Sequence, residues 1–119
     1  MTGCLMVGAA VLALASPEFT LRWTHSVEKV EWVEQWRAEP DQLHLTQVAV
    51  KGSGAGMEPA DDAQLIGGWW VWHADRRVPE LYLAASGATG AGWTLCSGGQ
   101  CHALGAAPGP ALRVWPCGG

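Results

Sequence analysis

A histidine and a carboxylate in this 119-residue chain have the spacing of an acid–base pair. His25 and Glu34 lie on two neighbouring segments in which apolar and polar side chains alternate. If Glu28-Lys29 forms the turn between these segments, cross-strand pairing places His25 opposite Trp32. Glu34 is then the diagonal neighbour of the histidine, roughly 7–8 Å away. A histidine oriented by a carboxylate can act as a general base.

The sequence leaves two interpretations of Glu34 open. The same pairing puts Trp23 opposite Glu34, on a face rich in tryptophan where a lone ionised group is expensive to bury. The carboxylate therefore needs a partner, for which His25, Lys29 and Lys51 are the candidates. The pair is either a structural contact that fixes strand register, which the sequence favours, or a site whose acid and base are tuned by burial.

A glycine-rich segment, residues 52–59, is the second candidate site. Gly54 and Gly56 permit positive φ and close backbone approach, which can expose amide donors to an anion. The segment is not a phosphate loop, because no Gly-Lys-Ser/Thr follows, and Pro59 argues against the long helix of a dinucleotide site. Glu58 is the residue there that could bind a cation. A tight connection between strands is the favoured interpretation.

Eight tryptophans, beside one tyrosine and one phenylalanine, dominate the aromatic composition. In the segment Trp69-Trp70-Val71-Trp72-His73, strand alternation puts Trp70 and Trp72 on one face and Trp69 on the other. Exposed rings would suit sugar stacking or a partner surface. Burying six of the eight would remove about 1,000 Å² from water, worth about 25 kcal/mol. The composition therefore favours a core role for the tryptophans.

The cysteines indicate an oxidising compartment. Cys96 and Cys101 bracket a four-residue turn of a predicted β-hairpin, and a disulfide closing so small a loop contributes about 2 kcal/mol. Cys117 could pair with either of them instead. A zinc site made by these three cysteines and His102 is the disfavoured alternative, because no second Cys-x-x-Cys pair is present. We therefore expect no metal and no cofactor.

The elements that carry these residues follow a period of two rather than 3.6. Eight short alternating runs, separated by Gly, Pro and Asp, predict an all-β fold, a small antiparallel sandwich or barrel. The runs start near residues 19, 32, 43, 69, 80, 93, 101 and 111. The break over residues 52–68 is long enough to be a functional loop or to contain a short element.

Residues 5–15 form an apolar run that is too short to span a bilayer. With Ala13-Leu14-Ala15 before Ser16 it is typical of an export signal, although no Lys or Arg precedes it. The alternative is that the run is an inner strand or helix of the domain. We expect a signal-like leader, residues 1–15, and a single β domain, residues 16–119. The protein would then be periplasmic or on the outer face of the cytoplasmic membrane, where the N-terminus could tether it.

Charge and motifs exclude several function classes. Seven Lys/Arg against eleven Asp/Glu give a net charge of −4, which argues against nucleic-acid binding. No nucleophile elbow, His-Glu-x-x-His or paired-carboxylate pattern is present. The sequence therefore favours a protein that is not an enzyme.

Three segments resemble a prokaryotic family of unknown function, DUF1850. They are Phe-Thr-Leu-Arg-Trp-Thr-His-Ser-Val-Glu-Lys at residues 19–29, Glu-Gln-Trp at residues 34–36, and Lys-Gly-Ser-Gly-Ala-Gly-Met-Glu-Pro at residues 51–59. The resemblance implies a small exported or membrane-anchored protein, often encoded beside tripartite (TRAP) transporters with a solute receptor of the TAXI type. It carries no established activity.

The resemblance implies that a site, if there is one, lies at the motif positions. These are His25, Ser26, Glu28, Lys29, Glu34, Gly54, Gly56 and Glu58. We expect a non-enzymatic accessory module that docks to a TRAP-type transporter or handles its solute. The alternative is a small ligand-binding domain or enzyme, with His25 as base, Glu34 as its orienter and the loop from Gly52 to Gly56 as an anion cradle.

Overall fold

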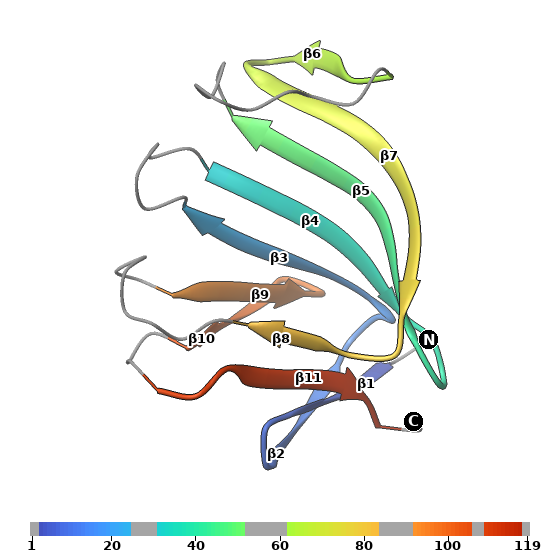
Figure 1. Ribbon diagram of the computed structural model, residues 1–119, viewed down its shortest axis with the longest axis vertical. Coiled ribbons are helices and arrows are strands. Elements are labelled where there is room, and N and C mark those ends of the chain that lie inside the picture. The colour runs from blue at the N-terminus through green and yellow to red at the C-terminus, as the bar shows by residue number, and fades with distance from the viewer. Residues whose placement is uncertain (1–2, 25–30, 52–61, 84–91, 106–108, 118–119) are drawn as a thin grey trace.

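The computed structural model describes residues 3–24, 31–51, 62–83, 92–105 and 109–117. These residues form two antiparallel sheets (Figure 1), in the order β10-β9-β3-β4-β5-β7-β6 for the large sheet and β2-β1-β11-β8 for the small sheet. Within the described ranges, no helix has the length and apolar character to cross a bilayer. The strands are β1 (Gly3–Val7), β2 (Ala10–Leu14), β3 (Glu18–Thr24), β4 (Glu31–Ala38), β5 (Leu43–Lys51), β6 (Gln64–Ile66), β7 (Trp69–Val78), β8 (Leu81–Leu83), β9 (Trp93–Ser97), β10 (Gln100–Leu104) and β11 (Leu112–Pro116).

The predicted all-β antiparallel fold is confirmed, as an open pair of sheets rather than a closed barrel. The eight predicted runs correspond to β3, β4, β5, β7, β8, β9, β10 and β11. Three further strands are present. The long break before Trp69 contains β6, which is the short element that the sequence allowed, and β1 and β2 lie in the N-terminal apolar run.

The N-terminal apolar run forms a hairpin that belongs to the small sheet. Its strand β1 pairs with both β2 and β11, with Leu5 opposite Pro116. Leu5 is fully buried, and Leu14 is 4% exposed. β1 is therefore an inner strand, one of the two alternatives that the sequence left open, and β2 forms the edge of the small sheet. Cleavage after Ala15 stays a prediction.

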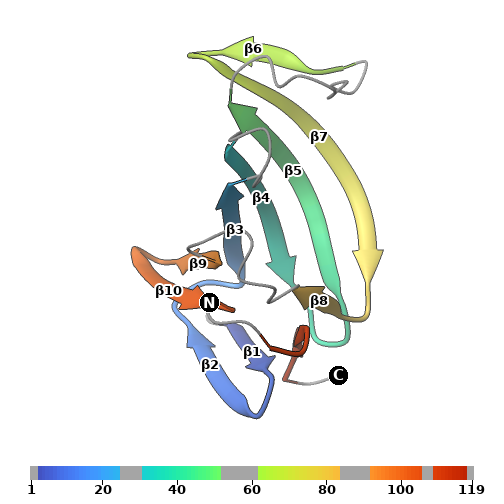
Figure 2. The same ribbon diagram turned by 60° about the vertical axis from the view of Figure 1, so that its left-hand side comes forward.

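The two sheets share one hydrophobic core. The large sheet forms a curved wall, and the small sheet lies against one end of its concave side (Figures 1 and 2). Fully buried side chains come from both layers, including Leu5 and Val114 from the small sheet and Phe19, Leu21 and Leu95 from the large sheet. Register shifts in the β4–β5 and β5–β7 ladders bend the wall, because a bulge increases local twist.

The tryptophans have a smaller role in the core than the composition favours. Trp36 is 3% exposed and is the one tryptophan in the buried core. The other seven, all among the described residues, keep part of their surface accessible. Trp32, Trp72 and Trp93 pack against the core, and the rings of Trp23, Trp32 and Trp93 contact one another in a cluster beside it.

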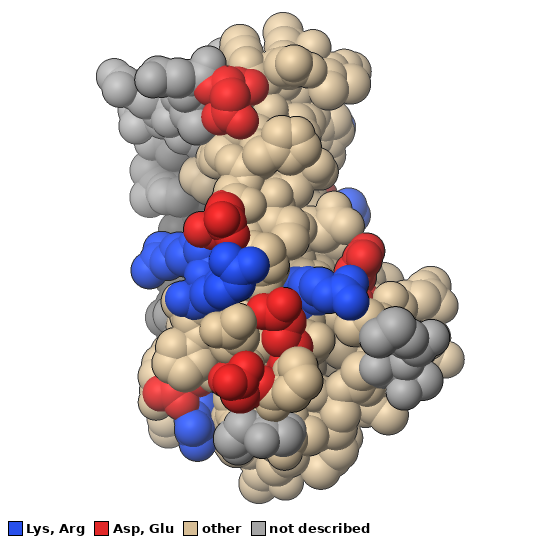
Figure 3. All heavy atoms as spheres, turned by 90° about the vertical axis from the view of Figure 1, so that its right-hand side faces the viewer, with Lys and Arg blue, Asp and Glu red and all other residues tan. Residues whose placement is uncertain are grey.

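The outer face of the wall carries ion pairs that link neighbouring strands. His44 Nε2 lies 2.7 Å from Asp75 Oδ1, and Arg77 donates to the same oxygen at 2.8 Å. These contacts join β5 to β7 close to the irregularity in their pairing. Figure 3 shows the side that faces right in Figure 1, where positive and negative side chains lie next to one another.

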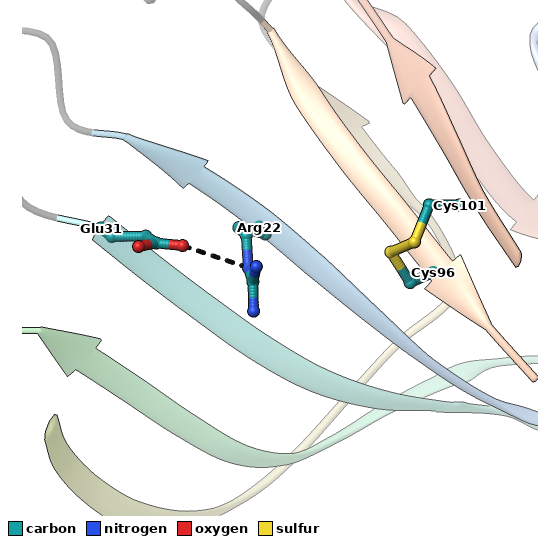
Figure 4. The surroundings of a disulfide bond; sticks show 4 residues. All are labelled: Arg22, Glu31, Cys96 and Cys101. Carbon is teal, nitrogen blue, oxygen red and sulfur yellow. Dashed lines mark ion pairs between the residues drawn. A yellow bond between two sulfur atoms is a disulfide. The ribbon is translucent and has the colours of Figure 1, made fainter. Parts of the chain in front are cut away.

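Two disulfide bonds link neighbouring strands. The predicted Cys96–Cys101 bond joins β9 to β10 across their hairpin, with Cα atoms 4.1 Å apart (Figure 4). Gly98 and Gly99 form its turn with φ of 58° and 82°, as a two-residue hairpin requires. The expectation that Cys117 could pair with either of these cysteines is wrong. Cys117 bonds to Cys4, because β1 and β11 are antiparallel neighbours whose ends bring the two residues together.

Candidate functional site

A cavity of about 350 Å³ lies between the concave face of the large sheet and β8 of the small sheet. Its walls are mainly apolar and aromatic, with contributions from β3, β4, β5, β7, β8 and β9. Three charged residues line it. They are Glu34, Arg76 and Glu80. The predicted site residue Glu34 is therefore part of a hollow in the molecule.

Glu34 faces inward from the middle of β4. It lies opposite Leu21 on β3 and Val48 on β5, and both of these are buried core residues. The indole Nε1 of Trp36, two residues further along the same face, donates a hydrogen bond to Glu34 Oε1 at 3.1 Å. Burial raises the pKa of Glu34, while the Trp36 hydrogen bond and the positive charge of Arg76 oppose that rise.

The pairing of β3 with β4 differs from the predicted register by two residues. Trp23 lies opposite Trp32, and Leu21 lies opposite Glu34, so the predicted pairing of Trp23 with Glu34 is wrong. In the observed register Trp23 stacks on Trp32. Arg22 also forms an ion pair with Glu31 at 3.2 Å, which Figure 4 shows. The prediction that Glu34 faces inward is nevertheless confirmed, because a shift of two preserves the face of every side chain.

Arg76 supplies the positive charge of the cavity. It lies on β7 opposite Leu45 of β5 and is solvent-exposed. Within the described part of the chain, Arg76 makes no ion pair within 4 Å. Lys51, one of the predicted partners of Glu34, instead holds its Nζ 5.7 Å from the ring centroid of Trp69. The prediction of Lys51 as the partner is therefore wrong.

Aromatic rings from four strands, β3, β4, β7 and β9, pack against one another beside Glu34. The ring centroids of Trp23 and Trp93 are 4.5 Å apart, and Trp32 stacks on the other side of Trp23 at 5.7 Å. Trp72 meets Trp32 edge-on at 6.4 Å. Trp23 and Trp93 line the cavity together with Trp36. The cavity therefore has three indole walls.

Glu80, in the connection between β7 and β8, is a second carboxylate of the cavity, and both of its oxygens accept hydrogen bonds. Tyr82 donates its hydroxyl to Glu80 Oε1 at 2.8 Å, and Arg113 Nε donates to Glu80 Oε2. These two hydrogen bonds lower the pKa of Glu80. The Arg113 guanidinium in turn lies 3.8 Å from the ring centroid of Trp115. Glu80 is thus a fixed anion, whereas Glu34 Oε2 makes no hydrogen bond to a described residue.

The remaining predicted site residues lie outside the described residues. These are His25, Ser26, Glu28, Lys29, Gly54, Gly56 and Glu58, together with the rest of the loop from Gly52 to Gly56. The pairing of His25 with Glu34 therefore stays a hypothesis. Within the described ranges, no group of three or more His, Cys, Asp or Glu side chains could hold a metal ion.

Arg76 and Trp93 line the cavity but were not predicted as site residues. Alternation that starts from Trp70 and Trp72 would place residue 76 on the same inner face, but this argument fails if a strand ends or bulges. The ladder is in fact irregular between Trp72 and Arg76. The signal available in the sequence was that no Gly or Pro occurs between His73 and Val78, so the strand could continue through Asp75.

Comparison with known sequences identifies the family. The family described as "Domain of unknown function (DUF1850)" matches residues 19–104. A search of curated proteins and a search of solved structures each found no match. The matched range includes Glu34, Arg76 and Trp93 and covers well over half of the chain. The protein therefore belongs to the DUF1850 family, as the three sequence motifs predict.

Proposed function

We propose that this protein is a non-enzymatic module that holds a small molecule in the cavity between its two sheets. The observation that carries the proposal is the state of Glu34. One of its oxygens is fixed by Trp36 and the other has no hydrogen-bond partner among the described residues, inside a hollow walled by indole rings. Such a carboxylate is costly to maintain in a purely structural role, because burial disfavours its charge.

The dimensions of the cavity support the same proposal. Small-molecule sites have volumes of about 300–1,000 Å³, with mostly apolar walls and a few polar groups that orient the ligand. The cavity here has about 350 Å³, three tryptophan walls and two charged groups with unused hydrogen-bonding capacity. A compact organic molecule fits these properties better than a polymer or a protein segment.

Native mass spectrometry tests whether the cavity binds a ligand. The protein is purified gently from its own host, and a bound small molecule is sought as added mass. Leu81→Trp and Val78→Phe place larger side chains at the cavity wall and should abolish the added mass. Val11→Trp is the matched control, because Val11 is 65% exposed and does not line the cavity. An adduct that persists equally in both cavity variants with native thermal midpoints would refute the proposal.

We further propose that the protein is exported and acts beside a TRAP-type solute transporter by holding its solute. Two disulfides support an oxidising compartment. The transporter association rests on the expectation that family resemblance gives. It predicts that deleting the protein lowers uptake through the neighbouring transporter, and that a C-terminally tagged copy co-purifies with transporter subunits.

The cavity variants separate docking from solute handling in that experiment. If the module docks and also holds solute, Leu81→Trp should still co-purify with the transporter while uptake falls. Unchanged uptake after deletion, together with a tagged protein that purifies alone, would remove the transporter association and leave the binding cavity to be judged by mass spectrometry.

A further inference from the structure

The cavity presents two opposite charges that do not neutralise each other by contact. Glu34 lies on β4 and Arg76 on β7, and both strands pair with β5. Strands are spaced about 4.8 Å apart, so the two backbones are separated by about 10 Å. No ion pair within 4 Å joins these two residues. A ligand that carries both a positive and a negative group can therefore lie between them.

The indole walls favour a cation close to Glu34. Indole faces attract ammonium groups within about 6 Å of the ring centroid, most strongly when the cation is shielded from water. Trp23, Trp36 and Trp93 line the cavity with Glu34, and Trp36 is bonded to the carboxylate. A cation held by Glu34 thus meets aromatic surface as well as a negative charge.

The available acceptors favour a methylated ammonium over a primary one. A primary ammonium has three N–H donors and needs an acceptor for each when it leaves water. Glu80, the other carboxylate among the described residues that line the cavity, already accepts hydrogen bonds from Tyr82 and Arg113. A fully methylated ammonium has no donors to satisfy, and its methyl groups pack on the rings.

Arg76 supplies the positive charge that would bind the acidic group of such a ligand. Its guanidinium presents a planar set of donors that matches a carboxylate. Arg77, the next residue, is paired with Asp75 at 2.8 Å and with Glu39 at 3.8 Å, so it is not available in the same way. The contrast between the two neighbours identifies Arg76 as the group that receives the acidic end of a ligand.

We propose that the cavity recognises a methylated-ammonium zwitterion of the betaine class, with the ammonium held by Glu34 and the tryptophans and the carboxylate held by Arg76. This inference rests on the proposed function, because it names the ligand class of the same cavity.

Three compounds of nearly equal shape test the inference by calorimetry and tryptophan fluorescence. Glycine betaine carries both charges. 3,3-Dimethylbutanoate replaces the nitrogen by carbon and keeps only the carboxylate, and choline keeps only the ammonium. Glycine betaine should bind about tenfold or more tightly than either, since each lost charge contact is worth about 1.4 kcal/mol or more. Equal binding of 3,3-dimethylbutanoate or of choline overturns the inference, and so does the absence of binding by all three.

Matched variants assign the two ends of the ligand. Glu34→Gln should lower betaine affinity towards that of 3,3-dimethylbutanoate, and Arg76→Gln should lower it towards that of choline. The controls are Glu31→Gln, which lies on the same strand as Glu34, and Arg77→Gln, which is next to Arg76. Both controls should bind betaine like the unmodified protein. A loss in the controls equal to that in the cavity variants would contradict the assignment.

Failure of this inference is distinguishable from failure of the proposed function. If none of the three compounds binds, but native mass spectrometry finds another molecule that Leu81→Trp displaces, the cavity is a binding site and its ligand class is not the betaine class. If native mass spectrometry finds no molecule that Leu81→Trp displaces, and the protein binds none of the three compounds, both the proposed function and the ligand class are refuted.

Discussion

The indole N–H of Trp36 donates to the carboxylate of Glu34 at 3.1 Å, between two residues that share the inner face of β4. Trp36 is anchored in the core, with 3% of its surface exposed, whereas Glu34 faces the cavity. The hydrogen bond therefore ties the position of a cavity-lining carboxylate to the packing of the core. It also places a stabilising contact next to a group whose charge is disfavoured by burial.

Replacing Glu34 by glutamine should change how stability depends on pH. Burial raises the pKa of Glu34 above its ordinary value of 4.5, so the folded state holds the proton more tightly than the unfolded state. The protonated carboxyl of Glu34 favours the folded state. This contribution to stability is fully present below pH 4.5 and is lost as pH rises through the folded-state pKa. Glutamine does not titrate, so the Glu34→Gln variant does not lose this stability as pH rises. The free energy of unfolding of Glu34→Gln, relative to that of the unmodified protein, should therefore increase from pH 4 to pH 7.

Chemical denaturation at several pH values measures that difference. Glu31→Gln is the control, because Glu31 lies on the same strand and pairs with Arg22 on the outer face. Parallel stability curves for the unmodified protein and Glu34→Gln would show that burial does not penalise the carboxylate.

Trp36→Phe should destabilise the protein and shift the Glu34 titration upward. The substitution removes the indole donor and leaves a smaller ring in a core position. A lost hydrogen bond and the unfilled volume together cost about 2 kcal/mol. The hydrogen bond lowers the pKa of Glu34, so its removal should raise that pKa further.

A double-mutant cycle with Glu34→Gln isolates the interaction between the two residues. The carboxyl titration is followed by NMR in the unmodified protein and in Trp36→Phe. Additive stability effects and an unchanged Glu34 titration would contradict the coupling.

The two disulfides should contribute unequally to stability. The Cys4–Cys117 bond spans a sequence separation of 113, and the Cys96–Cys101 bond a separation of 5. Loop-closure entropy predicts about 5 kcal/mol for the first and about 2 kcal/mol for the second. Denaturation of the paired serine variants, Cys4→Ser/Cys117→Ser against Cys96→Ser/Cys101→Ser, compares them. The reverse order of stability loss would be inconsistent with this account.

Alternation of side chains was sufficient to predict most of the large sheet. Phe19 and Leu21 face inward together with Trp36 and Glu34, as predicted, because sidedness survives a register shift of two. The register itself was not predictable, since it depends on how the Trp23 and Trp32 rings stack.

Three features could not be predicted for identifiable physical reasons. Counting by two from Trp72 assigns Arg76 to the inner face, but its place in the cavity depends on β7 continuing through the irregularity in the β5–β7 ladder, which the sequence does not show. A run of apolar residues without alternation has the pattern of a leader as well as of an inner strand, so the sequence left β1 as one of two alternatives. Without β1, the partner of Cys117 was also hidden, because only the pairing of β1 with β11 brings Cys4 beside it.

The N-terminal hairpin should be required for folding. Deleting residues 1–15 removes β1 and β2, leaves β11 with β8 as its one described neighbour, and separates Cys117 from its partner. We expect the shortened chain to lose cooperative unfolding. In the intact chain, Leu5→Ala should cost about 2–5 kcal/mol because Leu5 is fully buried, whereas Val11→Ala at an exposed position should change stability by less than about 0.5 kcal/mol.

Intact mass and denaturation decide between this expectation and a cleaved leader. The mass of the protein from its own host shows whether the mature chain retains Cys4, and denaturation of the shortened chain shows whether residues 16–119 fold alone. A mature chain that begins at Ser16 and unfolds cooperatively would show that the small sheet is stable without β1 and β2. Retention of the hairpin, with the Cys4–Cys117 bond formed, would instead make the apolar run part of the folded domain, because its side chains fill the core that β11 shares with the large sheet.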